Sequence, residues 1–402
     1  MMSVTYSNRL GCALLLAVFS MLFASCSVEN HASTPATQDS LFANAPASPI
    51  SLANGPSNVV VGDLNNDRKL DLVVAFGRTR TIVVLPGKGD GQFGAALSET
   101  TVTDSPGEIA GGDVNRDGNL DVAISSHDSY GVMLLLGNGR GGLAVAPTSP
   151  VLMRLGQQPH THGLAIADMN HDDKLDLVTT NNNDNDISIA LGDGRGNFTR
   201  APQSPFPVGP SPYPFAVGDV NNDGWMDVAA TASATGPSRR QQLPLSRALT
   251  LLLSDGKGGL AARQLPLRTG EPWFAAIGDL NGDGKADIVA SHHELNALTV
   301  LVGNGRGEFV EGPGSPFDFG VSIFHIVIAD VNRDGKKDVI GATGDSIRVL
   351  LSDGSGVLKS TTPVTVGRGA YRLAVADLNG DGRSDVVTSN SESNSVSVLL
   401  GR

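Results

Sequence analysis

The sequence has few cysteines, few aromatic residues and no excess of positive charge. Only 2 of its 402 residues are cysteine, and aromatic residues make up 5%. Cys12 lies in the signal segment described below, so that only Cys26 would remain after processing, and a lone cysteine cannot form an internal disulfide. The formal net charge of −12 argues against a nucleic-acid-binding protein, in which a basic stripe is expected.

Charged residues are sparse, at 17%, whereas glycine is abundant, with 49 residues, and 40% of the chain is hydrophobic. This composition is typical of many short strands joined by tight turns, and not of helices or disorder. A chain of this length is long enough for one large β domain with a sizeable core.

The first 25 residues have the pattern of a signal peptide. Arg9 is the only charge before an apolar run, residues 10–24, which is too short for a comfortable transmembrane helix. The run ends in Phe-Ala-Ser-Cys at residues 23–26, which resembles a bacterial lipoprotein box, where cleavage precedes a cysteine that is then acylated. The alternative is an ordinary secretory signal with an incidental cysteine.

We therefore predict lipidation of Cys26 and an exported protein that is lipid-anchored at the bacterial cell envelope, at the outer membrane or cell surface. Residues 26–40 are rich in Ser, Thr, Ala and Pro and are expected to form a flexible tether. Contact with the membrane would then be through the lipid anchor alone.

A nine-residue pattern, D-x-N-x-D-x-x-x-D, occurs seven times in the rest of the chain. An apolar run precedes each copy and another follows it, a third run often ends in a glycine turn, and a fourth comes next. Four short strands in a unit of about 50 residues are typical of one propeller blade. We predict an all-β fold, a seven-bladed β-propeller of four-stranded blades over residues 41–402.

The two ends of the chain indicate how this propeller closes. The last repeat stops at Arg402, after its third strand. Three internal repeats run F/L-x-x-x-P-x-S-P into the fourth strand, and residues 42–49 have the same spacing. The N-terminal strand is therefore expected to complete the last blade, which leaves no free sheet edge and favours a monomer.

The nine-residue pattern supplies the oxygen ligands that calcium prefers. Calcium takes six to eight oxygens from carboxylates, amides, backbone carbonyls and water. Positions 1, 3, 5 and 9 are Asp, Asn, Asp and Asp in every copy, and position 7 would contribute its carbonyl oxygen. The predicted ligands are Asp63, Asn65, Asp67, Lys69, Asp71; Asp113, Asn115, Asp117, Asn119, Asp121; Asp168, Asn170, Asp172, Lys174, Asp176; Asp219, Asn221, Asp223, Trp225, Asp227; Asp279, Asn281, Asp283, Lys285, Asp287; Asp330, Asn332, Asp334, Lys336, Asp338; and Asp377, Asn379, Asp381, Arg383, Asp385.

Up to seven calcium ions are thus expected, and two other interpretations of the loops fit less well. An EF-hand needs a glutamate at position 12, which no copy has. Metal-free Asx turns would explain one such loop but not seven that share four ligand positions. Position 6 is glycine in five copies, as a sharp turn favours, whereas Arg68 and Asp173 replace it in the first and third. Occupancy of those two loops stays open.

The repeat unit resembles the FG-GAP/VCBS repeat of integrin alpha-subunit heads and of many bacterial surface proteins. The loops at 279–287 and 377–385 carry the resemblance, together with Leu-Leu-Gly-Asn-Gly-Arg-Gly at 135–141. The resemblance covers about residues 41–402 and implies a calcium-binding propeller. It implies less about function, because the repeat serves adhesion proteins, lectins and accessory modules of enzymes.

The end of the propeller opposite the loops is a candidate ligand site. Six residues before each loop, five consecutive repeats place a ring: His162, Tyr213, Trp273, Phe324 and Tyr371. Rings beside amides and carboxylates suit a carbohydrate or protein ligand. The alternative is that these rings fill gaps between blades. A transition metal on His160, His162, His292 and His293 is conceivable, although no spacing demands it.

These observations predict a calcium-binding cell-surface binding or adhesion module. The alternative is an extracellular polysaccharide-degrading enzyme, a lyase or hydrolase, on the same scaffold. An enzyme is disfavoured because nearly all regularly placed carboxylates belong to the calcium loops and are not available for catalysis. No catalytic residues are assigned. A deep pocket with Arg, His and Tyr or Glu would favour the enzyme, and a shallow ring of aromatics would favour binding.

Overall fold

Each repeat folds into an antiparallel meander because turns separate its apolar runs. In the first repeat, β3 (Asn58–Gly62), β4 (Asp71–Phe76), β5 (Thr81–Leu85) and β6 (Ser98–Thr101) pair in that order. All six residues of β4 are buried, as expected for a strand covered on both faces. β6 alternates between half-buried and exposed residues, which places it at the outer edge.

The computed structural model describes residues 40–156, 159–232 and 247–402. The predicted signal peptide, Cys26 and the predicted tether up to residue 39 therefore lie outside the described residues. In the part of the chain that is described, no helix is long and apolar enough to cross a membrane.

The other repeats follow the same plan. The second contains β7 (Pro106–Gly112), β8 (Asp121–Ser126), β9 (Gly131–Gly137), β10 (Leu143–Val145) and β11 (Val151–Leu152); the third β12 (Thr161–Ala167), β13 (Asp176–Asn181), β14 (Asp186–Gly192), β15 (Phe198–Arg200) and β16 (Phe206–Pro207); the fourth β17 (Ala216–Gly218), β18 (Asp227–Ala230), β19 (Ala248–Ser254) and β20 (Leu260–Pro266). The fifth contains β21 (Phe274–Gly278), β22 (Asp287–His292), the 3-10 turn η2 (His293–Leu295), β23 (Ala297–Gly303), β24 (Phe309–Glu311) and β25 (Phe317–Asp318); the sixth β26 (His325–Ala329), β27 (Asp338–Ala342), β28 (Gly344–Ser352) and β29 (Leu358–Ser360); and the seventh β30 (Val364–Ala376), β31 (Asp385–Asn390) and β32 (Ser395–Gly401).

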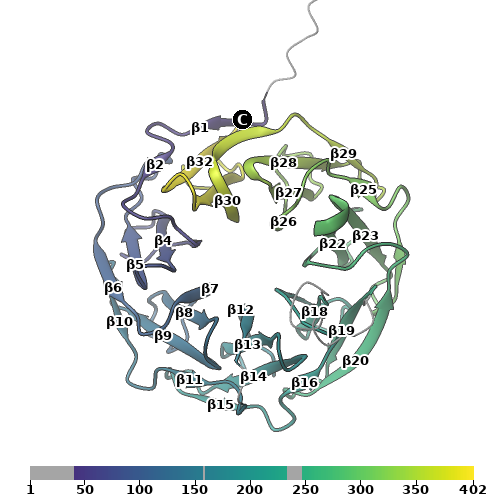
Figure 1. The fold of residues 1–402 in the computed structure, drawn as a ribbon, viewed down its shortest axis with the longest axis horizontal. Helices are drawn as coiled ribbons and strands as arrows, with labels where there is room; N and C mark the ends of the chain where they lie inside the picture. The colour runs from purple at the N-terminus through teal and green to yellow at the C-terminus, as the bar shows by residue number, and fades with distance from the viewer. Residues whose placement is uncertain (1–39, 157–158, 233–246) are drawn as a thin grey trace, which may run out of the picture. The chain divides into compact units, whose positions relative to one another are not determined.

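The seven meanders form six sheets, because two of them share one sheet. β28 of the sixth repeat pairs with the unusually long β30 of the seventh, which joins them into a nine-stranded sheet. Within residues 40–402 the meanders are arranged around a central axis, with the first strand of each innermost (Figure 1). The fold is thus the predicted β-propeller, with this one fusion of neighbouring blades.

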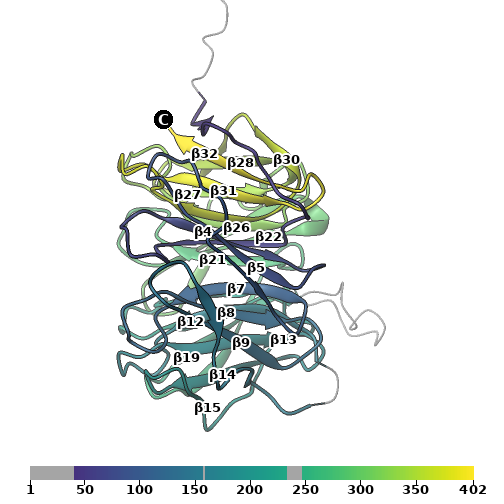
Figure 2. The same cartoon turned by 90° about the vertical axis from the view of Figure 1, so that its left-hand side faces the viewer.

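Neighbouring meanders pack face to face, and this packing forms the hydrophobic core. One cluster joins Val73 and Val84 of the first repeat to Val122 and Leu135 of the second. Contacts between innermost strands run from β3 to β7 and from β7 to β12, and on the other side from β26 to β30 and from β30 back to β3. Figure 2 shows the sheets from the side, stacked against one another.

The N-terminal segment completes the last meander, as predicted. β1 (Phe42–Asn44) pairs with β32 in the register Phe42↔Gly401, and β2 (Ile50–Ser51) pairs with the other end of β32. The Ser48 hydroxyl accepts a hydrogen bond from the Val398 amide at 2.9 Å. The serines of the three internal copies of the motif accept the same bond, from Leu134, Ile189 and Val300. The N-terminal copy therefore occupies the outer-strand position that the other copies hold.

Candidate metal loops and the cavity at the opposite end

The seven loops occupy equivalent places in the meanders. In each, position 1 directly follows the innermost strand and position 9 is the first residue of the second strand; Asp63 follows β3, for example, and Asp71 begins β4. Of the rings predicted as ligand contacts, Tyr213, Trp273 and Phe324 precede their innermost strands. His162 is the second residue of β12, and Tyr371 lies within β30, six residues before its loop. Loops and rings are therefore separated by the length of a strand and lie at opposite ends of it.

All seven loops share one backbone conformation, including the two that lack glycine at position 6. The φ angles of the five glycines range from 77° to 87°, and those of Arg68 and Asp173 are 65° and 62°. This left-handed region is unfavourable for side chains other than Gly, Asn and Asp. The first and third loops thus adopt the same geometry as the others, and Arg68 pays the larger steric cost.

Positions 1, 3 and 5 surround the backbone at the tip of each loop. In the first loop, the Asp63 and Asn65 side-chain oxygens both accept from the Asp67 amide, at 3.2 and 2.9 Å. The second Asp63 oxygen accepts from the Arg68 amide at 2.8 Å. Equivalent bonds to position 1 recur in the other loops. The position-1 side chain therefore accepts from backbone amides at the tip of its own loop.

Position 9 has a structural task in every loop that the sequence pattern did not reveal. Asp71 is fully buried, and its carboxylate accepts from the amides of Leu64 in the loop and Gly87 beyond the third strand, at 2.9 and 2.8 Å. The same pair of bonds recurs in the other six loops, on Asp121, Asp176, Asp227, Asp287, Asp338 and Asp385. This aspartate joins the first and third strands of its meander.

The position-9 carboxylates are held where negative charge is unfavourable. Burial raises the pKa of Asp121, and repulsion from Asp117 and Asp113 adds to the increase, to about 6. Burial and the same kind of repulsion raise the pKa of the other six. A divalent cation beside positions 1 and 5 would offset this repulsion.

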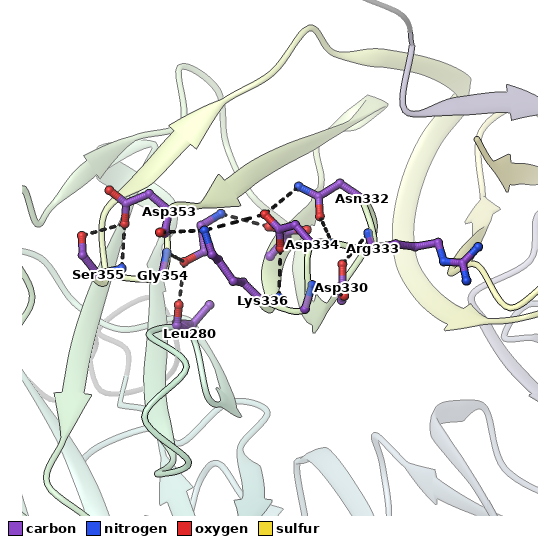
Figure 3. A network of polar contacts seen from close by, with 12 residues as sticks. Leu280, Asp330, Asn332, Arg333, Asp334, Lys336, Asp353, Gly354 and Ser355 are labelled. Atoms are coloured by element: carbon purple, nitrogen blue, oxygen red, sulfur yellow. Dashed lines mark hydrogen bonds and ion pairs between the residues drawn. The ribbon is translucent and has the colours of Figure 1, made fainter.

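The sixth loop shows how the charges are balanced (Figure 3). The Lys336 ammonium group lies 4.0 Å from the Asp334 carboxylate and donates to the Asp353 carbonyl at 2.8 Å. In the third and fifth loops the position-7 lysine lies 3.0 Å from the position-5 aspartate. Because position 7 is expected to offer only its carbonyl, these lysine side chains are free to move aside for a cation.

The loops fit calcium in the chemistry of their donors, and their carboxylates are widely spaced. Among the described residues, three aspartates of one loop do not come within 4.8 Å of one another; the triad that does is His127, His160 and His162. Opposite oxygens around calcium lie up to about 5 Å apart, since each is 2.3–2.6 Å from the ion. Calcium binding by a loop would therefore require its carboxylates to move closer together.

Three of the five predicted rings lie in a row, in which the first pair is stacked and the second is tilted by 31°. The His162 and Tyr213 ring centroids are 4.2 Å apart with planes 17° from parallel, and Tyr213 and Trp273 are 4.1 Å apart. Phe324 and Tyr371 form a looser pair at 5.7 Å. All five rings are at least partly exposed, and Tyr371 retains 37% of its accessible surface. Complete burial, which core plugs would show, is not observed.

A cavity of ≈ 520 Å³ lies among the ring positions, although Trp273 and Phe324 do not line it. Five of the seven equivalent positions line it: Ser57, Gly107, His162, Tyr213 and Tyr371. The other lining residues come from their neighbours in sequence and from turns between second and third strands: Asn58, Pro106, Glu108, His127, Thr161, Arg372 and Ser391. The cavity thus has aromatic walls and several polar groups.

A buried ion pair lies in this cavity and links distant repeats. The Arg372 guanidinium contacts the Glu108 carboxylate, which also accepts from Asn58 Nδ2 at 2.8 Å. Arg372 lies 4.6 Å from the Tyr371 ring centroid, and its Nη1 has no hydrogen-bond partner among the described residues. Burial lowers the pKa of Arg372 to about 9. Glu108 and Arg372 were not predicted as site residues, although each directly follows a ring-equivalent position.

Comparison with known proteins supports the repeat assignment. A model of the FG-GAP-like repeat matches residues 63–124, 113–179, 168–230, 279–341 and 330–388. No curated protein sequence matches the chain.

Solved structures show the same fold at low sequence identity. BBS1N, crystallised in complex with ARL6DN, is 13% identical, with a TM-score of 0.60 over 90% of this chain and 97% of that one. An Agrocybe aegerita lectin, described as recognising non-reducing terminal N-acetylglucosamine, is 18% identical, with a TM-score of 0.55 over 78% and 81%. Virginiamycin B lyase from Staphylococcus aureus is 14% identical, with a TM-score of 0.55 over 88% and 98%.

Proposed function

This chain belongs to the FG-GAP-like repeat family, and from that premise we propose that it is a calcium-stabilised binding module that takes a carbohydrate in the cavity lined by Tyr213 and Tyr371. The observation that carries the proposal is the combination of stacked, partly exposed rings with the Glu108–Arg372 pair in one cavity. Sugars present apolar faces to rings and hydroxyl groups to polar side chains.

The charge of the cavity favours a neutral ligand. Glu108 and Arg372 neutralise each other, whereas Arg372 Nη1 still needs an acceptor, such as a sugar hydroxyl oxygen. A ligand hydroxyl there would satisfy a buried donor and so gain more than one on an exposed surface. A protein partner could present a similar group, but a cavity of ≈ 520 Å³ holds a small sugar better than a flat protein surface.

Calcium would act at the other end, in the predicted loops. The Asp113 and Asn115 side-chain oxygens both accept from the Asp117 amide. Burial and repulsion from Asp117 and Asp113 raise the pKa of Asp121, and a divalent ion would offset that repulsion. Ions that bind only the folded chain stabilise it by mass action. We further propose export and lipid anchoring through Cys26, which would leave the propeller outside the cell.

The test is a glycan array probed with the purified protein, with and without calcium, and with Tyr371→Ala. We expect binding to a restricted set of glycans that Tyr371→Ala greatly weakens, because aromatic anchors often contribute about 2 kcal/mol or more. Leu152→Ala is the matched control, since Leu152 is 57% exposed and does not line the cavity. Absence of glycan binding by the calcium-loaded wild type would refute the carbohydrate proposal.

A polysaccharide-degrading enzyme is the second candidate, because the same cavity holds Arg372, Glu108, His162 and two tyrosines. Two properties disfavour it. Burial lowers the pKa of His162 to about 2 and raises that of Tyr371, whereas an efficient general base has a pKa near the working pH. Incubation with polysaccharides, followed by assays for new reducing ends and for unsaturated products, distinguishes the two candidates.

A further inference from the structure

Three histidines meet at the junction of the second and third repeats. Nitrogen atoms of His127, His160 and His162 all lie within 4.8 Å of one another. Their ring centroids are 4.4–4.5 Å apart, and each pair of rings is within 7° of perpendicular. No other trio of His, Cys, Asp or Glu residues in the described ranges has its ligand atoms this close.

The local backbone accounts for the convergence. His160 and His162 flank Thr161 at the start of β12, and alternate residues of an extended chain point to the same side. His127 follows β8, in the turn that faces β12 across the junction between meanders, and β8 and β12 are in contact. His160 and His162 were among four histidines considered from the sequence, although no spacing singled them out, and the third member of the cluster comes from another repeat.

Burial and mutual proximity favour the neutral form of the three imidazoles. His160 Nε2 and His162 Nε2 lie 2.8 Å apart, so that one nitrogen donates its hydrogen and the lone pair of the other accepts it. A metal ion bound by both nitrogens would replace this hydrogen bond. Burial lowers the pKa of all three histidines, and the proximity of the other imidazoles lowers those of His160 and His162 further. Neutral imidazole is the metal-binding species.

We propose that His127, His160 and His162 form a site for a transition-metal ion of the zinc class. Three imidazole nitrogens are an established donor set for zinc, with a fourth position left for water or a ligand atom. The proposal is independent of the calcium loops, which lie at the other end of the innermost strands and offer only oxygen atoms.

The distances suit such an ion after a small adjustment. Two nitrogens bound tetrahedrally at 2.0–2.1 Å from zinc are about 3.3 Å apart. The His160–His162 contact of 2.8 Å would open by about 0.5 Å, and the widest separation, at most 4.8 Å, would close. Rotation of the His127 side chain in its turn could supply most of the change.

The position of the site gives the ion a role in ligand recognition. His127 and His162 line the cavity, and the His162 ring stacks on that of Tyr213, which also lines it. The stack fixes the orientation of this ring, as outer contacts of metal ligands commonly do. The fourth coordination position would therefore face the cavity and could accept an oxygen atom from a bound molecule.

The experiment is a titration of the full-length, calcium-saturated protein with Co²⁺, followed by visible absorption and competition with Zn²⁺. Excess calcium occupies the loops, so that any cobalt spectrum reports on nitrogen ligation elsewhere. We expect one Co²⁺ per chain, displaced by one Zn²⁺. His127→Ala and His160→Gln should each weaken binding at least 100-fold, since loss of a ligand exceeds the 10–100-fold cost of losing an outer-shell partner.

His171→Asn is the matched control. His171 is at position 4 of the third loop with φ 60°, and Asn66 and Asn222 occupy the same position with φ 60° and 58°. This variant should bind Co²⁺ as the wild type does. The proposal fails if the wild type shows no cobalt spectrum, or if the control His171→Asn loses the spectrum as the histidine-cluster variants do. It also fails if His127→Ala and His160→Gln melt like the wild type and keep the cobalt spectrum. If one histidine variant fails to fold, the wild-type titration and the other variant decide.

Discussion

Phe42→Ala measures how much the N-terminal strand contributes to the closed fold. Phe42 is 2% exposed and packs in a cluster that includes Leu399 of β32 and Ile347 of β28. Truncating a buried phenylalanine removes its transfer free energy and leaves a cavity, which together cost about 3–5 kcal/mol. Relaxation of the outer strand would bring the cost toward the lower end of this range.

The assay is equilibrium unfolding in urea at saturating calcium, with thermal melting in parallel. An unfolding entropy of about 2.1 cal/mol/K per residue converts the loss into a decrease of about 4–7 °C for a domain of this size. Val310→Ala is the matched control. Val310 lies in the equivalent outer strand of the fifth repeat, and its side chain is 69% exposed. It follows Phe309, which pairs with Gly303 as Phe42 pairs with Gly401. It should change stability by no more than about 0.5 kcal/mol.

A decrease in the free energy of unfolding below about 1 kcal/mol in Phe42→Ala would refute the reasoning, because truncating a buried residue of an integral strand should destabilise the fold by more than this. Deletion of residues 41–54 extends the test. It removes every partner of the outer edge of β32, whose unpaired amides and carbonyls would then be a template for association. A truncated chain that stays monomeric and melts like the wild type would contradict the closure.

Four further predictions concern the metal loops, the cavity and the anchor. Elemental analysis should find five to seven calcium ions per chain. Chelation should lower the melting temperature, since a site with free calcium at 100 times its Kd contributes about 2.7 kcal/mol. An unchanged melting temperature would contradict calcium binding by the loops. Tyr213→Ala should abolish glycan binding at a cost below about 1 kcal/mol, whereas a loss of 3–5 kcal/mol would mean that the ring packs the core. Arg372→Met should lower the free energy of unfolding by about 3–5 kcal/mol, because Glu108 loses its partner. The double variant with Glu108→Gln should recover most of this free energy. No recovery would mean that the two groups are not coupled. In a Gram-negative host, Cys26→Ser should release the protein from membranes, and a wild type that is already soluble would contradict the anchor.

The repeat pattern predicted the fold well because each of its constraints is local. Aspartates at positions 1 and 9 mark the end of one strand and the start of the next, and these boundaries hold in all seven meanders. The F/L-x-x-x-P-x-S-P spacing identified the N-terminal copy of the outer strand, which the pairing of β1 with β32 confirms. The pairing of the two chain ends could be predicted because the N-terminal segment and the last three strands are parts of one repeat.

The cavity was harder to predict because it is assembled across repeats. Glu108 and Arg372 are 264 residues apart, and His127 meets His160 and His162 from a neighbouring meander. Nothing in the separate repeats relates these side chains until the ring of strands is closed. The pattern likewise did not reveal that position 9 accepts hydrogen bonds from two backbone amides, because a carboxylate suits that structural role as well as the predicted role of metal ligand.

The innermost strands connect the two ends of the molecule. β3 carries Asn58, a partner of Glu108, at one end, and Asp63 follows its other end. β30 carries Arg372 near the cavity and leads into Asp377 of the seventh loop. Because only a few extended residues separate each pair, a cation that orders the loops also limits the motion of the strands that position the cavity. Calcium should therefore strengthen ligand binding without contacting the ligand. When calcium is removed, the affinity for the ligand and the melting temperature should fall together.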